Sequence, residues 1–355
     1  MTDPGAIWGD VVGQGQVVDR LRSSADAPVH AYLFVGPAGS TKLEAARAFA
    51  TRLITGSENA EQRDARLIGV GEHPDVHEVR RVGASIAKAQ AEHIVRIASL
   101  SPIESERKIL VLEEFHLVSP EGAGILLKTI EEPPDSTIII ILCDFVPHDL
   151  ITISSRCVRL DFHPLEARQV VDRLVAEGIP IDAATSAARS AHGDLRRARL
   201  LATDPAAAER RQAFAEVPHR LDGTGSVALA AATELLTLVE AAAEPLAARH
   251  AAEVEVLDDQ IRQHGERGSG KKQLETRHKQ ETRRHRTDEL RGGLAALAAT
   301  YRDTLANGTA IDVEACADAV HRVHVAIDAL DRNANETLLI EALLWSLPDA
   351  TGIGR

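Results

Sequence analysis

The sequence has few of the residues that build metal knuckles, disulfide frameworks or base-stacking surfaces. Its 355 residues include three cysteines and only 3% aromatic residues. Cys143, Cys157 and Cys316 lie far apart and form no C-x-x-C pair, which removes the case for a zinc knuckle or a disulfide framework. We therefore expect free thiols, no bound metal and no zinc.

The chain also lacks a long apolar run and an excess of basic residues. No uninterrupted apolar segment reaches the roughly 18 residues that a membrane-spanning helix needs, and the N-terminus lacks the charged-then-apolar pattern of a signal peptide. The formal net charge of −13 argues against a simple basic nucleic-acid binder. We expect a soluble, cytoplasmic protein with no membrane partner, in which any nucleic-acid contact is local or shared with partners.

Three short apolar runs are continuous rather than alternating, which is typical of strands buried on both faces of a parallel sheet. They cover residues 30–35, 108–112 and 138–142. A tight turn and a helical segment from Glu44 to Leu53 follow the first run. The pattern predicts a doubly wound α/β domain over residues 1–163.

The composition changes after Pro164. Residues 164–204 are predicted to form a small group of helices. Asp204-Pro205 marks a second boundary, because proline disfavours helical backbone in the residue before it. Residues 205–355 carry alanine, leucine and charged residues at helical spacing, which predicts an all-helical third domain.

A locally basic stretch lies inside this third domain, near residues 262–291. Glycines at positions 265, 268 and 270 interrupt it, so we predict a loop followed by a long, exposed helix with few apolar residues. A solvated charged face is the simpler interpretation. Contact with phosphate groups is the alternative, although no aromatic residues alternate with the charges as base stacking requires.

The segment from Gly36 to Leu43 has the outline of a phosphate-binding loop with two altered residues. A working loop reads G-x-x-x-x-G-K-[ST], in which glycines let backbone N–H groups surround the phosphates, lysine binds the β and γ oxygens and the hydroxyl holds Mg²⁺. Here Thr41 replaces the second glycine and Leu43 replaces the hydroxyl residue. The residues left to hold a phosphate are Gly36, Gly39 and Lys42.

The backbone at Thr41 raises a second doubt about this loop. A β-branched residue at positive φ is a strained outlier, so we expect the loop to follow a different path there if glycine's conformation is required. Lys42 would then face solvent or cap a neighbouring element.

Two acids, Glu113 and Glu114, follow the second predicted strand, where the metal and the attacking water of a phosphate-loop enzyme are held. The usual first acid is aspartate, and Glu113 is one methylene longer. Because Mg²⁺ demands near-ideal octahedral geometry at about 2.0–2.1 Å, this change and the missing hydroxyl at Leu43 remove two of its supports. We therefore expect no productive ATP hydrolysis and weak or absent ATP binding. Two solvated acids at a strand end are the alternative interpretation.

Several short segments together resemble one family. In chain order they are Val12-Gly13-Gln14, the phosphate-loop outline, His73-Pro74-Asp75, the strand ending in Glu113-Glu114, Leu126-Leu127-Lys128-Thr129-Ile130-Glu131-Glu132-Pro133-Pro134, and Ser155-Arg156-Cys157. This order resembles the bacterial clamp-loader AAA+ subunits of DNA polymerase III, over most of the first 200 residues. The segment from Thr287 to Asp303 also resembles the C-terminal region of actinobacterial members.

The resemblance implies a fold and a role. The fold is an α/β AAA+ core, a parallel sheet with flanking helices, followed by a small helical lid and an all-α C-terminal collar. The role is that of a clamp-loader subunit in DNA replication, assembled with motor subunits and a delta-type subunit in a hetero-pentamer. The sliding clamp would be an indirect partner, and primer–template DNA would be contacted through the assembled complex. Such a subunit belongs to a DNA-directed DNA polymerase, a nucleotidyltransferase, without being catalytic alone.

The resemblance also implies roles for single residues. In that family Ser-Arg-Cys supplies an arginine finger to the ATP site of the adjacent motor subunit, which places this role on Arg156. A guanidinium delivered in trans stabilises charge on the transferred phosphoryl group. Arg196, after Gly193-Asp194, matches the lid arginine that senses nucleotide in active relatives. Cys143 or Asp144 stands at the sensor position, where Asn or Thr is usual.

The sequence departs from the family in one segment and leaves other functions open. Many relatives carry a four-cysteine zinc module before His-Pro-Asp, but residues 56–72 contain no cysteine. We expect this segment to fold without zinc or to have shrunk to a helix and a turn. One open alternative is an active AAA+ ATPase, such as a motor subunit or a branch-migration helicase. Another is a stand-alone nucleic-acid binder that uses residues 262–291.

Overall fold

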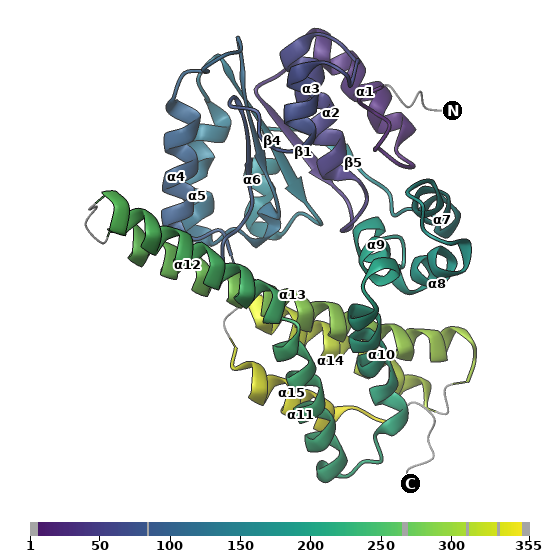
Figure 1. Ribbon diagram of the computed structural model, residues 1–355. Coiled ribbons are helices and arrows are strands. Elements are labelled where there is room, and N and C mark those ends of the chain that lie inside the picture. Colours follow the sequence, from purple (N-terminus) through teal and green to yellow (C-terminus); the bar gives the residue numbers. More distant parts are fainter. Residues whose placement is uncertain (1–5, 84, 265–268, 310–311, 332–333, 350–355) are drawn as a thin grey trace. The chain divides into compact units, whose positions relative to one another are not determined.

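The structure is a computed structural model in which residues 6–83, 85–264, 269–309, 312–331 and 334–349 are described. The chain divides into two compact units (Figure 1). The first consists of Met1–Arg81 and Ser85–Thr203, and the second of Val82–Ala84 and Asp204–Arg355. The predicted core and lid both fall within the first unit, and the division into three domains stays a prediction.

The first unit is built on a parallel sheet of five strands in the order β2-β3-β4-β1-β5. The strands are β1 (Ala31–Val35), β2 (Val76–Val79), β3 (Lys108–Leu112), β4 (Thr137–Cys143) and β5 (Val158–Asp161). In the central pair, Leu33 of β1 lies opposite Ile141 of β4. All residues of β1, β3 and β4 are buried, as their continuous apolar character predicts.

Helices cover both faces of this sheet (Figure 1). Tyr32 and Phe34 face α1 (Gly15–Asp26), α2 (Lys42–Thr55) and α3 (Arg63–Gly69). Leu33 and Val35 face α4 (Lys88–Ser99), α5 (Pro120–Glu131) and α6 (Ile151–Ser154). Two short 3-10 turns, η1 (Phe115–Leu117) and η2 (His148–Leu150), follow β3 and β4. The predicted α/β core is confirmed.

Three short helices complete the first unit: α7 (Ala167–Ala176), α8 (Ile181–Ala191) and α9 (Leu195–Thr203). They enclose a small core of their own that includes Val170 and Leu174. Glu177, after α7, bonds Arg199 of α9 at 2.7 Å and Arg173 of α7 at 2.6 Å, and Arg173 also pairs with Asp10 at 2.7 Å. The hydrogen bonds from Arg199 and then Arg173 lower the pKa of Glu177 to about 2, against the effect of burial. These ion pairs join α7 to α9 and to Asp10 of the N-terminal segment.

The described part of the second unit is helical, which confirms the predicted all-α C-terminal region. Its helices are α10 (Pro205–Arg220), α11 (Gly225–Ala241), α12 (Glu244–His264), α13 (Ser269–Ala306), α14 (Val313–Asp331) and α15 (Glu336–Ser346). They pack around one core that contains Phe214, Leu235, Leu294, Tyr301 and Val323. Gly293 allows the ring of Phe214 to lie against α13, because a Cβ there would come within 2.5 Å of the ring.

One helical stretch of the described chain, Gly225–Glu255, is long and apolar enough to cross a membrane by length and composition. Ala228, Ala232 and Leu235 on this stretch are buried in the helical core. Of the window that passes this test, 28% is buried. Acidic residues such as Glu234 interrupt the stretch, so it is not the uninterrupted apolar segment whose absence was noted in the sequence.

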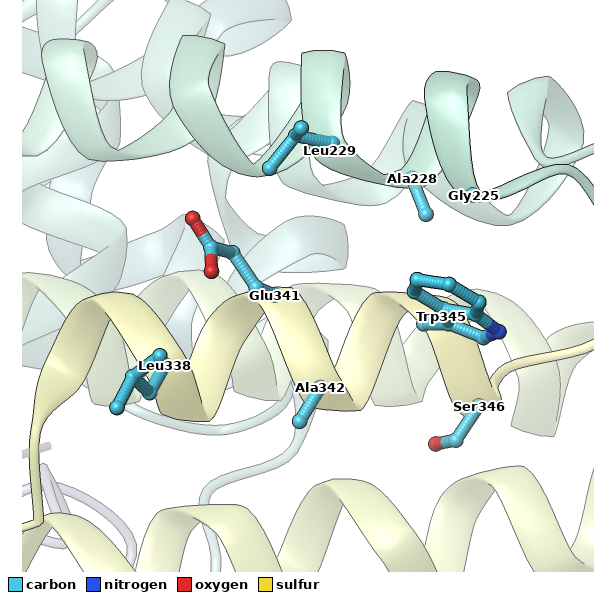
Figure 2. A pocket seen from close by; sticks show the side chains of 8 residues that line it. All are labelled: Gly225, Ala228, Leu229, Leu338, Glu341, Ala342, Trp345 and Ser346. Carbon is cyan, nitrogen blue, oxygen red and sulfur yellow. The ribbon is translucent and has the colours of Figure 1, made fainter.

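A shallow apolar groove of about 470 Å³ lies between α11 and α15 (Figure 2). Its lining residues are Gly225, Ala228, Leu229, Leu338, Glu341, Ala342, Trp345 and Ser346. The ring of Trp345, which is 74% exposed, lies against Gly225, where a Cβ would stand 3.2 Å from the ring. The groove offers one carboxylate and no cation, so it is not a phosphate site.

Candidate nucleotide site and arginine finger

Thr41 adopts the left-handed backbone conformation that favours glycine. It stands immediately before α2 with φ of 61° and ψ of 29°, in the left-handed region. Its side chain is buried, and Oγ1 donates a hydrogen bond of 3.3 Å to the carbonyl of Val12. The expectation of a different backbone path at Thr41 is therefore wrong. Burial and this hydrogen bond offset a strain of about 1–3 kcal/mol.

Gly36 and Gly39 are needed for packing. A Cβ on Gly36 would stand 2.4 Å from the carbonyl oxygen of Phe162, just after β5. Gly39 has φ of 71°, and a Cβ there would stand 2.0 Å from Oδ1 of Asp194. The backbone N–H of Leu195 also bonds the carbonyl of Gly39 at 3.4 Å. The loop is thus packed against the start of α9.

Gln14, the last residue of the Val-Gly-Gln segment, fastens the loop from the other side. Its side chain is buried, and Nε2 donates to the carbonyls of Ser40 at 3.3 Å and His163 at 2.8 Å. Its Oε1 accepts the backbone N–H of His163 at 3.1 Å. One amide therefore ties the phosphate loop to the connection between β5 and α7. Sequence reasoning included Gln14 in a motif without finding this role.

Lys42 is turned inward and uses its donors within the loop. It is 8% exposed, and Nζ donates to the carbonyls of Gly36 and, at 2.7 Å, Pro37. It also forms an ion pair of 3.0 Å with Oδ1 of Asp144. An ammonium group has three N–H donors, so these three partners use all of them. Of the two expectations for Lys42, exposure to solvent is wrong, whereas bonding of neighbouring backbone carbonyls is observed. Asp144 at the sensor position supplies its counter-charge.

Cys143, the other candidate at the sensor position, ends β4 and is buried. Burial, followed by the charge of Asp144, raises the pKa of the Cys143 thiol to about 12. A neutral, buried thiol can contribute packing but no charge to a phosphate site.

Glu113 and Glu114 lie next to two arginines that sequence reasoning missed. Nε of Arg81, which is buried, stands 3.2 Å from Glu114, and Nε of Arg80 stands 3.5 Å from Glu114 and 3.9 Å from Glu113. The two glutamate side chains are only 15% and 21% exposed, so neither is a solvated acid. Burial raises the pKa of Glu113. Guanidinium groups thus stand beside the acids that would face a metal in an active site.

Arg196 is exposed on α9. It forms no ion pair with another described residue, although its charge acts on Glu113.

The His73-Pro74-Asp75 motif is structural. The Asp75 carboxylate accepts backbone N–H bonds from Ile103 at 2.5 Å, Glu104 at 2.8 Å and Ser105 at 2.7 Å. Burial opposes ionisation, but these bonds outweigh it and lower the pKa of Asp75. The carboxylate thus holds the turn that leads into β3.

The cysteine-free segment of residues 56–72 contains one short helix, α3. Within the part of the chain that is described, no three His, Cys, Asp or Glu side chains stand close enough together to hold a metal ion.

Arg156 follows α6 and is anchored from two sides. Its Nη1 donates to the carbonyl of Thr152 at 2.8 Å and to Oγ of Ser155 at 3.2 Å. Its Nε forms an ion pair with Glu131, the last residue of α5. The side chain of Arg156 remains 41% exposed. The Leu-Leu-Lys-x-x-Glu-Glu-Pro-Pro and Ser-Arg-Cys segments therefore meet in space.

Cations of the basic stretch pair with acids within the second unit. Lys271 bonds Asp258 at 2.9 Å, and Arg277 pairs with Glu253 and Glu281. Residues 262–264, predicted as loop, end α12, and Gly270 lies in α13, while residues 265–268 are outside the described residues. The helix that follows is confirmed, with its charges largely balanced by neighbouring acids.

The contact between α12 and α13 repeats one sequence pattern, Arg-His-x-x-Glu. It occurs as Arg249-His250 with Glu253 and again as Arg277-His278 with Glu281. His250 bonds Glu281 at 2.9 Å and His278 bonds Glu253 at 3.0 Å. The two imidazole rings stack with centroids 3.9 Å apart. This interlocking favours the interpretation of the basic stretch as a charged structural face.

Comparison with known proteins gives consistent matches for the first unit. Residues 13–166 match the model of the family described as DNA polymerase III, delta subunit. The DNA polymerase III subunit delta' of Bacillus subtilis is 34% identical over 172 residues, covering 47% of this chain and 52% of that protein. The tau subunit of the same organism is 29% identical over 184 residues, covering 46% of this chain and 30% of that protein. The chain thus spans about half or less of these relatives' length.

Among solved structures, a gamma subunit-related protein of DNA polymerase III from Thermotoga maritima covers 92% of this chain and 97% of its own. It is 16% identical, with a TM-score of 0.44. The family match over residues 13–166 includes the phosphate loop, the segment that contains Glu131, and Arg156. Over residues 13–166 this chain is therefore similar to the DNA polymerase III delta'/clamp-loader family.

Proposed function

We propose that this chain is a clamp-loader subunit that does not hydrolyse ATP and supplies Arg156 to the ATP site of a neighbouring motor subunit. The observation that carries the proposal is the internal pairing of its own site. The N–H groups of Lys42 bond Asp144 and backbone carbonyls of the loop. Glu113 and Glu114 lie beside arginines. A phosphate group would have to displace these partners, whereas Arg156 is exposed.

The proposed partners follow from the family. The chain would assemble with motor subunits and a delta-type subunit in a hetero-pentamer in the cytoplasm. It would act on the sliding clamp indirectly and on primer–template DNA through the complex. It would thus form part of a DNA polymerase holoenzyme without catalysing a reaction alone.

Replacing Arg156 by Ala tests the proposal in a loader reconstituted with this chain, its motor subunits, clamp and primer–template DNA. An arginine finger contributes roughly 10³–10⁵ in rate at its own site. We expect the variant to fold and to lower ATP turnover of the whole loader by at least about twofold, because the remaining sites still work. Arg159→Ala removes another half-exposed arginine three residues away and serves as the matched control. Unchanged turnover in Arg156→Ala contradicts the proposal.

The second candidate is an active AAA+ ATPase, and one observation favours it. Thr41 retains the left-handed backbone of the loop, so the loop outline is intact. Titration of the isolated chain with labelled ATP, with and without Mg²⁺, separates the two. Metal-dependent binding followed by phosphate release would support the ATPase, and absence of binding would support the non-hydrolysing subunit.

A further inference from the structure

Arg156 uses only part of its hydrogen-bonding capacity within the chain. A guanidinium carries five N–H donors in a fixed plane. Nη1 bonds Thr152 and Ser155, and Nε faces Glu131. Nη2 makes no hydrogen bond to any described residue. One edge of the group is thus held while the end that carries Nη2 stays available.

Glu131 is placed to hold that edge. It is the last residue of α5, a twelve-residue helix whose residues Leu126 and Ile130 are fully buried against the sheet. Pro133-Pro134 ends the chain's helical course just beyond it. The carboxylate therefore stands at the end of a firmly packed element, while Arg156 follows the four-residue helix α6. The longer helix, α5, therefore fixes the position of the carboxylate with which Arg156 pairs.

We propose that Glu131 is the positioning residue of the arginine finger, a role that rests on the proposed function of Arg156. The ion pair at Nε and the hydrogen bonds at Nη1 restrict the rotamers of a long side chain before a neighbour arrives. The side chain of Arg156 is then ordered before the neighbouring subunit binds. Less conformational entropy is therefore lost when Nη2 bonds a phosphoryl oxygen. Because exposed ion pairs contribute little energy, the contact can adjust when the phosphate binds.

The adjacent acid makes a matched control possible. Glu132 carries the same charge in the same motif, is exposed, and forms no ion pair with a described residue. Glu131→Gln and Glu132→Gln therefore change the net charge equally. A general electrostatic effect on the neighbouring nucleotide would appear in both variants, whereas loss of positioning appears only in the first.

The experiment measures kcat and KM for ATP in the reconstituted loader containing each variant of this chain. We expect Glu131→Gln to lower kcat by about 3- to 10-fold with little change in KM, and Glu132→Gln to match the unaltered chain. Glu131→Asp, which keeps the carboxylate, should recover part of the loss. Glu131→Gln combined with Arg156→Ala should be no worse than Arg156→Ala alone, because the two act as one unit.

The outcomes separate this proposal from the function on which it rests. If Arg156→Ala lowers turnover but Glu131→Gln does not, Glu131 has no positioning role and the arginine finger stands. If Glu131→Gln raises turnover, the ion pair masks Arg156, and the proposal is also overturned. If Arg156→Ala itself has no effect, the proposed function fails. Circular dichroism and assembly of each variant into the complex exclude a loss that is due to misfolding.

Discussion

The two ends of the core that carry phosphate-related motifs use their charges differently. At the phosphate loop, the buried Lys42 forms an ion pair with the partly exposed Asp144. Its ammonium group also donates hydrogen bonds to backbone carbonyls of the loop. At the end of α5, Arg156 is held along one edge and keeps Nη2 free of described partners. The comparison teaches that a motif residue can be retained for folding at one site and for presentation at the other. Residue identity alone does not distinguish the two uses.

The largest effect should come from filling the space at Gly36. Gly36→Ala would place a methyl 2.4 Å from the carbonyl oxygen of Phe162, so we expect the free energy of unfolding to fall by about 3 kcal/mol. Urea unfolding followed by circular dichroism measures it. The control is Gly124→Ala on α5, where a Cβ meets open space and Ala should stabilise the helix by up to about 1 kcal/mol. Equal behaviour of the two variants would show that the loop is loosely packed.

Lys42→Met sharpens the comparison by separating stability from turnover. The change leaves the carbonyl of Pro37 and the carboxylate of Asp144 without their donor, so we expect a loss of about 1–3 kcal/mol in unfolding free energy. Turnover of the reconstituted loader should stay the same. Lys88→Met, on an exposed lysine, should change stability by less than about 0.5 kcal/mol. Lost turnover in a folded Lys42→Met loader would mean that Lys42 serves a nucleotide.

Acid should weaken the attachment of the helices that pack on the loop. The folded pKa of Glu177 is about 2, below its ordinary value of 4.5, so its stabilising contribution is complete above pH 4.5 and is lost as the pH falls toward 2. Unfolding free energies measured from about pH 6 to about pH 2.5 should show this decline. The decline should be shallower in Glu177→Gln. An identical pH profile in the variant would remove Glu177 as the cause.

The smallest effect is expected from the basic stretch. Arg277 already pairs with Glu253 and Glu281, so Arg277→Gln should change DNA retention by the isolated chain by less than about twofold at low salt. A filter-binding titration at two salt concentrations checks this. A marked loss, with a shallower salt dependence, would restore the nucleic-acid-binding interpretation of residues 262–291.

The sequence predicted the buried centre of the sheet and missed its edges. The continuous apolar runs that form β1, β3 and β4 were identified because both faces of these strands are covered. The edge strands β2 (Val76–Val79) and β5 (Val158–Asp161) have four residues each and are only partly buried. Their polar residues hide the pattern on which strand prediction depends. The helical lid and C-terminal region were predicted from helical spacing and the boundary at Asp204-Pro205.

The candidate site was predicted by residue type but not by contact. The direction of Lys42 depends on Asp144, which is 102 residues away in the sequence and carries no local signal for such a pair. The role of Arg81 beside Glu114 depends in the same way on the pairing of β2 with β3. Thr41 was expected to alter the loop, because strain was weighed without the burial that offsets it. Tertiary contacts decided each of these outcomes.

The inward turn of Lys42 has a consequence for chemical labelling. Reagents that deliver an acyl group from a bound nucleotide to the loop lysine require an amine that is accessible to the reagent. Here the amine is 8% exposed and donates to three oxygens. In a labelling experiment on a mixed complex, this lysine should remain unmodified while the corresponding amines of ATP-binding subunits react. The number of acylated loop lysines would then report how many nucleotide sites are occupied in the intact assembly. The unmodified Lys42 of this chain would serve as the negative control.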